Sequence, residues 1–268
     1  MSLNSCNMGN VIFINLTREK FLSTKLIYRY MPMEYALQTL NNQELWFAKP
    51  STWKDPFEKR FIEAMYKVQN QIIDFPLKDK VFCMCLTQTA ASEAYWNIYS
   101  RQQYGIKFSL NKEVLLKQLE DFASDPDCDY NVYIGGVEYM ATADIKKHLS
   151  KIPFNSPEPP IILNDRMCVR LLLLKRNAYK YEDEVRIILV RKKALNTNGF
   201  NWKYRCLNTD IIHTITLDPS IPPATESLYK EIFINKYKFH PVDTTKGIRH
   251  RVHKSQLYTQ QKITKIRM

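Results

Sequence analysis

The acidic triplet Glu182-Asp183-Glu184 is the feature of this chain best suited to chemistry. An apolar run typical of a β-strand follows it directly, over residues 184–191. Alternation along a strand places Glu182 and Glu184 on one side, at the mouth of that strand. Two neighbouring carboxylates repel, which raises one pKa and suits acid–base work or the stabilisation of a developing cation. The simpler interpretation is a charged strand end that forms salt bridges with nearby basic residues: Lys180, Arg186 or Arg170.

An aromatic group is the second candidate. Tyr95, Trp96 and Tyr99 stand at one- and three-residue spacing in a predicted helix that Ser92 would cap, so their rings share a face. Such a face can stack a nicotinamide, an adenine or a splayed base. For Trp96, packing in the hydrophobic core is the simpler interpretation.

Four patches from end to end of the chain resemble the bacterial domain-of-unknown-function family 2971. The resemblance covers nearly all of residues 26–260, which implies one domain, and it supplies no established activity. Tyr95 stands where the family pattern has methionine. The patches are Tyr28-Arg29-Tyr30 with Asp55-Pro56-Phe57-Glu58, Tyr95-Trp96-Asn97-Ile98-Tyr99 with Gly105, Tyr181-Glu182-Asp183-Glu184-Val185-Arg186, and Ser255-Gln256-Leu257-Tyr258.

The order Arg29, then Thr87 with Thr89, then Glu182-x-Glu184 also resembles the layout of ADP-ribosyltransferases. That resemblance implies that Arg29 holds the phosphates of NAD bidentately, that Glu184 is catalytic and that Glu182 positions the acceptor. Here Leu86-Thr87-Gln88-Thr89 replaces the Ser-Thr-Ser motif of those enzymes. The residues expected around NAD are Arg29, Tyr30, Thr87, Trp96 and Tyr99.

Charge points to a second class of partner. The chain of 268 residues has a net charge of +12, and residues 246–268 hold seven lysines and arginines with no acidic residue. A basic strip raises the local concentration of polyanions such as nucleic acid. Arg249, Arg251 and Lys254 are the residues that we expect to contact nucleic acid. The alternative is a solvated tail that keeps the protein soluble.

Several classes of protein are excluded or disfavoured. The six glycines have neither GxGxxG nor GxxxxGK spacing, so the phosphate loops of Rossmann and P-loop proteins are absent. No paired zinc spacing occurs, and the two histidines of His250-Arg-Val-His253 have no third ligand nearby, so we expect no metal. We expect no membrane span, and free thiols without an export signal favour the cytoplasm.

The elements that must position these residues alternate irregularly. Strands are predicted at 26–30, 44–48, 80–88, 106–110, 132–139, 184–191 and 211–217, and helices at 58–73, 92–100, 111–122, 144–149 and 226–237. Periodicity does not decide residues 161–174. Because helices group between strands of mixed spacing, we predict an α+β fold with a mixed, largely antiparallel sheet and packed helices.

For domain organisation, we predict an N-terminal extension over residues 1–25, one α+β domain over 26–245, and a basic segment at 246–268 that packs on the same domain. The four prolines of residues 153–160 form an internal loop in this interpretation and not a hinge. Asp55 and Pro56 are expected to start a helix, with Glu58 near the capping-box position.

Three functions therefore stay open. The first is an ADP-ribosyltransferase-like enzyme that uses NAD, with nucleic acid as a candidate acceptor. The second is a non-catalytic nucleic-acid-binding module that uses the basic segment and the aromatic face. The third is a toxin or defence effector whose partner sets its biology. The oligomeric state cannot be predicted from these residues.

Overall fold

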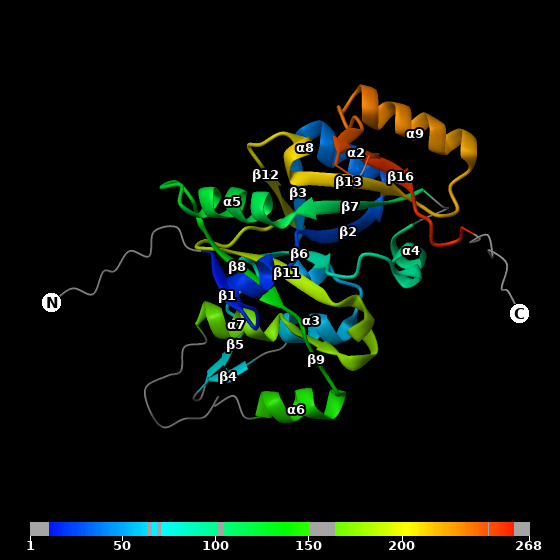
Figure 1. Cartoon of the computed structure of the whole chain (residues 1–268). Coiled ribbons are helices and arrows are strands. Elements are labelled where there is room, and N and C mark those ends of the chain that lie inside the picture. The colour runs from blue at the N-terminus through cyan, green and yellow to red at the C-terminus, as the bar shows by residue number, and fades with distance from the viewer. Residues whose placement is uncertain are drawn as a thin grey trace, which may run out of the picture.

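A computed structural model describes residues 11–63, 66–68, 71–100, 104–150, 164–245 and 247–259. The fold is α+β, with one mixed, mostly antiparallel sheet. Its path of hydrogen-bonded strands is β1-β8-β11-β6-β2-β7-β13-β16, and β3 and β12 join it through β6 (Figure 1). The predicted fold class is confirmed.

The strands of this sheet are β1 (Ile12–Ile14), β2 (Leu26–Pro32), β3 (Glu44–Ala48), β6 (Val81–Thr87), β7 (Gly105–Asn111), β8 (Tyr130–Gly136), β11 (Glu184–Arg191), β12 (Gly199–Lys203), β13 (Ile212–Leu217) and β16 (Val252–Lys254). Shorter pairs lie outside it: β4 (Tyr66–Val68) with β5 (Gln71–Ile73), β9 (Glu138–Met140) with β10 (Leu174–Arg176), and β14 (Val242–Thr244) with β15 (Gly247–Arg249).

The helices are α1 (Arg18–Leu22), α2 (Met33–Asn42), α3 (Pro56–Glu63), α4 (Glu93–Tyr99), α5 (Lys112–Ala123), α6 (Thr142–Ser150), α7 (Asp165–Leu171), α8 (Asn208–Ile211) and α9 (Pro223–Asn235). Two 3-10 helices, η1 (Pro50–Thr52) and η3 (Asn177–Glu182), precede α3 and β11. Side-chain caps start helices where the sequence predicts them: Ser92 accepts from the Tyr95 amide, and Asn111 from the Glu113 and Val114 amides.

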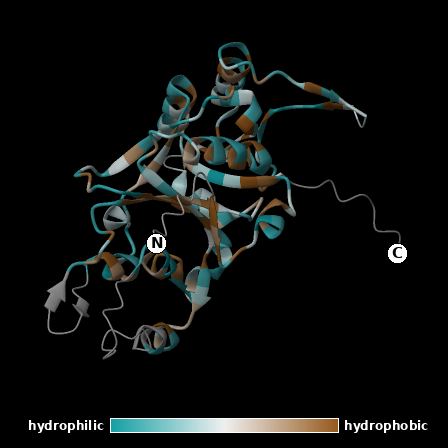
Figure 2. Cartoon of the chain, turned by 90° about the vertical axis from the view of Figure 1, so that its left-hand side faces the viewer, coloured by the Kyte–Doolittle hydropathy of each residue, from teal (hydrophilic) through white to brown (hydrophobic). Residues whose placement is uncertain are grey.

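Hydrophobic cores lie on both faces of the sheet. Successive residues of a strand point to opposite faces, so Phe82, Met84 and Leu86 of β6 join one core, whereas Val81 and Cys83 join another. Helices α2 and α5 contribute to the first core, and α3 and α7 to the second. Figure 2 shows hydrophobic colour along the central strands, between helices of mixed colour.

The sheet divides between β2 and β6. These strands are paired at a single position, Tyr28 with Thr87, although β2 pairs with β7 over its full length. Strand β3 likewise meets β6 only at Ala48 and Cys83. The strands therefore separate beyond the Tyr28–Thr87 pair, and this separation creates the site described below.

Two segments differ from the sequence-based expectation. The helix predicted over 58–73 ends at Glu63, and β4 and β5 follow as an antiparallel pair. Tyr66, Val68, Ile72 and Ile73 are strand-forming residues on either side of a short connection, which suits a hairpin better than a continued helix. The undecided run 161–174 contains α7, after which the chain enters β10.

The sheet begins upstream of the expected boundary at residue 26. Strand β1 pairs in parallel with β8, so part of the predicted N-terminal extension is a sheet strand. At the other end, β16 of the basic segment pairs in parallel with β13. The proline-rich loop 153–160 lies outside the described residues.

Candidate functional site

A cavity of about 910 Å³ opens where β2 and β6 separate. Its wall combines residues of β2, β3, β6, α2, α4 and the segment 52–58 with the end of η3 and the start of β11. This volume lies in the range of small-molecule sites, which are lined mainly by apolar and aromatic side chains with a few polar groups. The sequence-predicted residues that line the cavity are Arg29, Tyr30, Thr87, Tyr95, Tyr99, Glu182 and Glu184.

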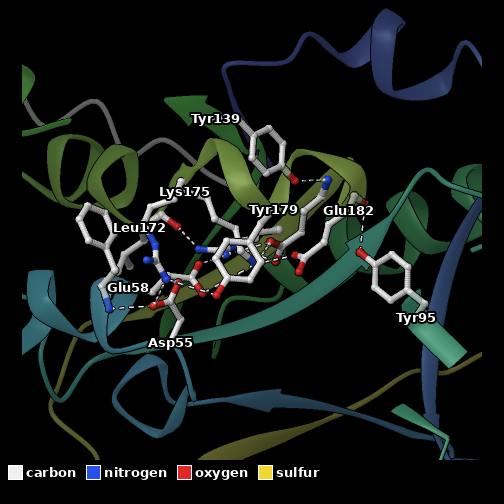
Figure 3. A network of polar contacts seen from close by, with 12 residues as sticks. Asp55, Glu58, Tyr95, Tyr139, Leu172, Lys175, Tyr179 and Glu182 are labelled. Carbon is white, nitrogen blue, oxygen red and sulfur yellow. Dashed lines mark hydrogen bonds and ion pairs between the residues drawn. The ribbon is translucent and has the colours of Figure 1, made fainter. Parts of the chain in front are cut away.

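A buried ionic network forms one side of the cavity (Figure 3). Lys175 Nζ lies 2.5 Å from Glu182 Oε2 and 3.0 Å from Glu184 Oε2. Arg186 Nε lies 2.9 Å from Glu184 Oε1, and its other nitrogens reach Glu58 and the carbonyl of Leu172. Three carboxylates therefore face two cations, so this network of Glu58, Lys175, Glu182, Glu184 and Arg186 carries one net negative charge.

The turn before β11 brings the two glutamates together. Asp183 is left-handed, with φ of 41°, so Glu182 belongs to η3 and only Glu184 belongs to the strand. The Glu182 carbonyl accepts hydrogen bonds from the hydroxyls of Thr87 and Tyr95, at 2.5 and 3.0 Å. The Glu184 amide donates to the Tyr139 hydroxyl at 2.9 Å. Glu182 and Glu184 therefore lie close together, as predicted. The left-handed turn at Asp183 brings them together, and not the alternation of side chains along a strand.

The pKa values of the two glutamates are shifted in opposite directions. Burial would raise the pKa of Glu184, but Arg186 and Lys175 outweigh burial and hold that pKa at about 2. For Glu182, burial dominates over the attraction of Lys175, and its pKa is raised. Glu184 is therefore a carboxylate neutralised by two cations, whereas Glu182 keeps the less compensated charge.

Arg29 of β2 lines the same cavity as the ionic network. Its guanidinium donates to the Trp46 carbonyl at 2.8 Å and contacts the Met84 sulfur at 3.0 Å. Burial lowers the pKa of Arg29 to about 10, so the side chain stays charged at neutral pH. In the described part of the chain, no carboxylate pairs with Arg29, and its charge is available to an anionic ligand.

Three tyrosine rings form a column beside the network. The rings of Tyr30 and Tyr95 stack with centroids 4.9 Å apart, and those of Tyr95 and Tyr99 with centroids 5.7 Å apart. All three rings line the cavity; Tyr30 and Tyr95 are buried, whereas Tyr99 is 39 % exposed. Tyr99 is therefore the accessible end of the column. We define Tyr30, Tyr95 and Tyr99 as the tyrosine column.

Trp96 does not take the ligand-binding position expected of it. It is 3 % exposed and does not line the cavity; its ring packs edge-on against Tyr30 at 4.9 Å. Consecutive residues of a helix are rotated by about 100° from each other, and of this pair Tyr95 lines the cavity whereas Trp96 packs behind Tyr30. Thr87 contacts the Glu182 carbonyl and stands at the cavity wall.

The three basic residues expected at a nucleic-acid interface differ in their contacts. Arg251 donates to the carbonyls of Thr209, Ile212 and His213, and Lys254 donates to the carbonyl of Ile221. These bonds hold β16 and the residue before it against α8, β13 and the loop after β13. Arg249 is exposed.

This difference predicts a structural role for Arg251. Arg251→Gln is expected to lower the free energy of unfolding by about 1–3 kcal/mol, because it removes charge-assisted bonds to backbone carbonyls. Arg249→Gln, the matched control, should leave it unchanged within about 0.5 kcal/mol. Urea unfolding of both variants checks this; equal stabilities would contradict it.

Sequence reasoning missed Lys175 and gave Glu58 only a capping role. Asp55 does start α3, since its carboxylate accepts from the Phe57 amide at 2.9 Å. Glu58, in contrast, is 6 % exposed and binds Arg186 of β11. The available signal was the placement of charges within apolar surroundings, at Lys175 after four leucines and at Arg186 inside β11.

Among the described residues, no group of three or more His, Cys, Asp and Glu side chains is placed to hold a metal ion. The helices in the described ranges include none with the length and apolar character required to cross a membrane.

Comparisons of the chain with models of known protein families, with curated proteins and with solved structures found no match.

Proposed function

We propose that the cavity binds NAD and that the protein breaks the bond between nicotinamide and ribose, as an ADP-ribosyltransferase-like enzyme of the bacterial cytoplasm. One observation carries this proposal: Arg29, the exposed ring of Tyr99 and the Glu182–Glu184 pair line a single cavity. An anion-binding group, a stacking ring and a carboxylate are the components that this cleavage requires.

Each component has a role that suits its surroundings. Arg29 has no carboxylate partner among the described residues and would bind the diphosphate. The face of Tyr99 that ends the tyrosine column would stack a planar ring of the ligand. The excess negative charge of the network would stabilise the ribosyl cation that forms when nicotinamide leaves.

Within the pair, the electrostatics favour Glu182 for contact with the developing cation. Both glutamates are buried, but Glu184 shares its charge with two cations, Arg186 and Lys175. Glu182 has one cation within 4 Å among the described residues, Lys175. We therefore propose that Glu182 stabilises the developing ribosyl cation and that Glu184 holds Lys175 in position. This assignment reverses the roles implied by the resemblance.

Binding and turnover test the proposal separately. Titration calorimetry should detect NAD binding by the wild type, and chromatography should detect nicotinamide release. Arg29→Gln is expected to weaken NAD binding about tenfold or more, because a charge-assisted contact to phosphate is lost. Arg18→Gln, a surface arginine paired with Glu120, is the control and should bind as the wild type does. A wild type that neither binds NAD nor releases nicotinamide would contradict the proposal.

A further inference from the structure

One wall of the cavity, formed by β3 and β12, contains neither the ionic network nor the tyrosine column. The two strands are antiparallel, and Asn201 of β12 stands directly opposite Trp46 of β3. Glu44 lies two residues before Trp46, on the same side of β3. All three side chains line the cavity, and we define Glu44, Trp46 and Asn201 as the β3–β12 wall.

A glycine on β12 makes room for the indole of this wall. A Cβ atom at position 199 would overlap two ring carbons of Trp46 and the Phe47 carbonyl, so only glycine leaves the ring where it is. The ring therefore leans diagonally from β3 onto the backbone of Gly199, which pairs with Ala48. The indole is nevertheless 42 % exposed. A ring supported by the backbone and still accessible from the cavity is suited to stacking a planar group.

The β3–β12 wall adjoins the arginine to which we assign the diphosphate. Strand β3 is paired with β6 at Ala48. Beyond that pair, the Trp46 carbonyl accepts a hydrogen bond from the Arg29 guanidinium at 2.8 Å. A diphosphate on Arg29 would therefore lie beside β3, and the nucleoside attached to it would lie within reach of the Trp46 ring.

Two polar side chains flank the indole with their hydrogen-bonding groups unused. In the part of the chain that the structure describes, neither Glu44 nor Asn201 forms a side-chain hydrogen bond or an ion pair. The amide of Asn201 presents a donor and an acceptor side by side, which complements N7 and N6 on the edge of adenine. The carboxylate of Glu44 can accept hydrogen bonds from the hydroxyls of a ribose.

We propose that the β3–β12 wall binds the adenosine half of NAD: Trp46 stacks the adenine, Asn201 binds its edge, and Glu44 accepts from the ribose hydroxyls. Tyr99 and the ionic network then receive the nicotinamide ribose. This assignment rests on the proposed function and adds a specificity to it. The charge of Glu44 repels a phosphate on the 2′-hydroxyl, so the cavity takes NAD and rejects NADP.

Calorimetric titration with ADP tests the stacking ring without the reaction, because ADP contains the adenosine and the diphosphate but no nicotinamide. Trp46→Ala should weaken the binding of ADP and of NAD about fivefold or more, the usual effect of losing a ring that stacks a base. Trp46→Phe, the matched control, keeps an aromatic ring and should weaken each by less than about threefold.

The base is tested with GDP, whose guanine presents two acceptors where adenine presents a donor and an acceptor. GDP should bind about fivefold or more weakly than ADP, and Asn201→Ala should remove most of this difference.

The ribose is tested with NADP, which should bind about tenfold or more weakly than NAD to the wild type. Glu44→Gln keeps an accepting oxygen and removes the charge, so it should reduce this ratio to about threefold or less. Glu113→Gln, at an exposed glutamate of α5 outside the cavity, is the control and should keep the wild-type ratio.

Nicotinamide release, measured on the same samples, separates this inference from the proposed function. The adenosine assignment is overturned, with the proposed function intact, if NAD is cleaved while ADP and GDP, or NAD and NADP, bind equally, or while the variants of the wall bind as the wild type does. ADP binding that depends on Trp46, without nicotinamide release, would support the assignment and count against the proposed function. A wild type that binds neither ADP nor NAD would overturn both.

Discussion

Arg186→Met is expected to lower the free energy of unfolding by about 3–5 kcal/mol at neutral pH, measured by denaturant unfolding. Arg186 is 1 % exposed and contacts Glu58, Glu184 and the Leu172 carbonyl. Without it, three buried carboxylates would face Lys175 alone. Removing one partner of a buried pair leaves an uncompensated charge, which costs far more than the pair contributes.

The pH dependence of this loss gives a second, independent measurement. In the wild type, the pKa of Glu184 lies at about 2, below its usual value of 4.5, so Glu184 stabilises the fold above pH 4.5 and loses that contribution as the pH falls towards 2. Without Arg186, the folded-state pKa of Glu184 rises, so the carboxylate can take up a proton. The difference in free energy of unfolding between the wild type and Arg186→Met should therefore become smaller as the pH falls from 7 to 4.

Arg191→Met is the matched control. Arg191 ends the same strand, and its guanidinium lies 3.6 Å from Asp129 near the surface. Arg191→Met should lower the free energy of unfolding by about 1 kcal/mol or less at every pH, as is usual for ion pairs near the surface. Equal, pH-independent losses in the two variants would show that the network contributes no more than ordinary packing.

Much of the scaffold followed from local sequence patterns. The apolar run of β11 and the capped helices α4 and α5 have signals contained within a few residues. The helix predicted over 58–73 failed because apolar spacing there fits both a helix and a hairpin, and pairing of β4 with β5 decided between them.

The candidate site was only partly predictable, for a physical reason. Arg29, Thr87, Tyr99 and the glutamates were selected, and they share one cavity. The contacts of Glu58 and Lys175 depend on tertiary packing between segments 117 residues apart in the chain. No pattern in either segment specifies that their charges would compensate each other.

The same limit explains the assignment of the two glutamates. Residue spacing alone does not distinguish Glu182 from Glu184. Arg186, two residues after Glu184, compensates the charge of Glu184 and not that of Glu182. Glu182→Gln is therefore expected to reduce the rate constant of nicotinamide release by about 10²–10³-fold, the usual cost of removing one group that stabilises transition-state charge. NAD affinity should change less than about threefold, because the negative charge matters mainly once the ribosyl cation develops.

Single-turnover nicotinamide release and calorimetric NAD binding measure the two quantities independently. Glu138→Gln, at an exposed glutamate on the adjacent strand β9, provides the control and should match the wild type in both. Glu184→Gln, compared under conditions in which it is folded, distinguishes the two carboxylates. A folded Glu184→Gln that is inactive beside a fully active Glu182→Gln would return the catalytic role to Glu184. If Glu182→Gln alone is slow and still binds NAD, the carboxylate with the less compensated charge is the one that faces the reacting ribose.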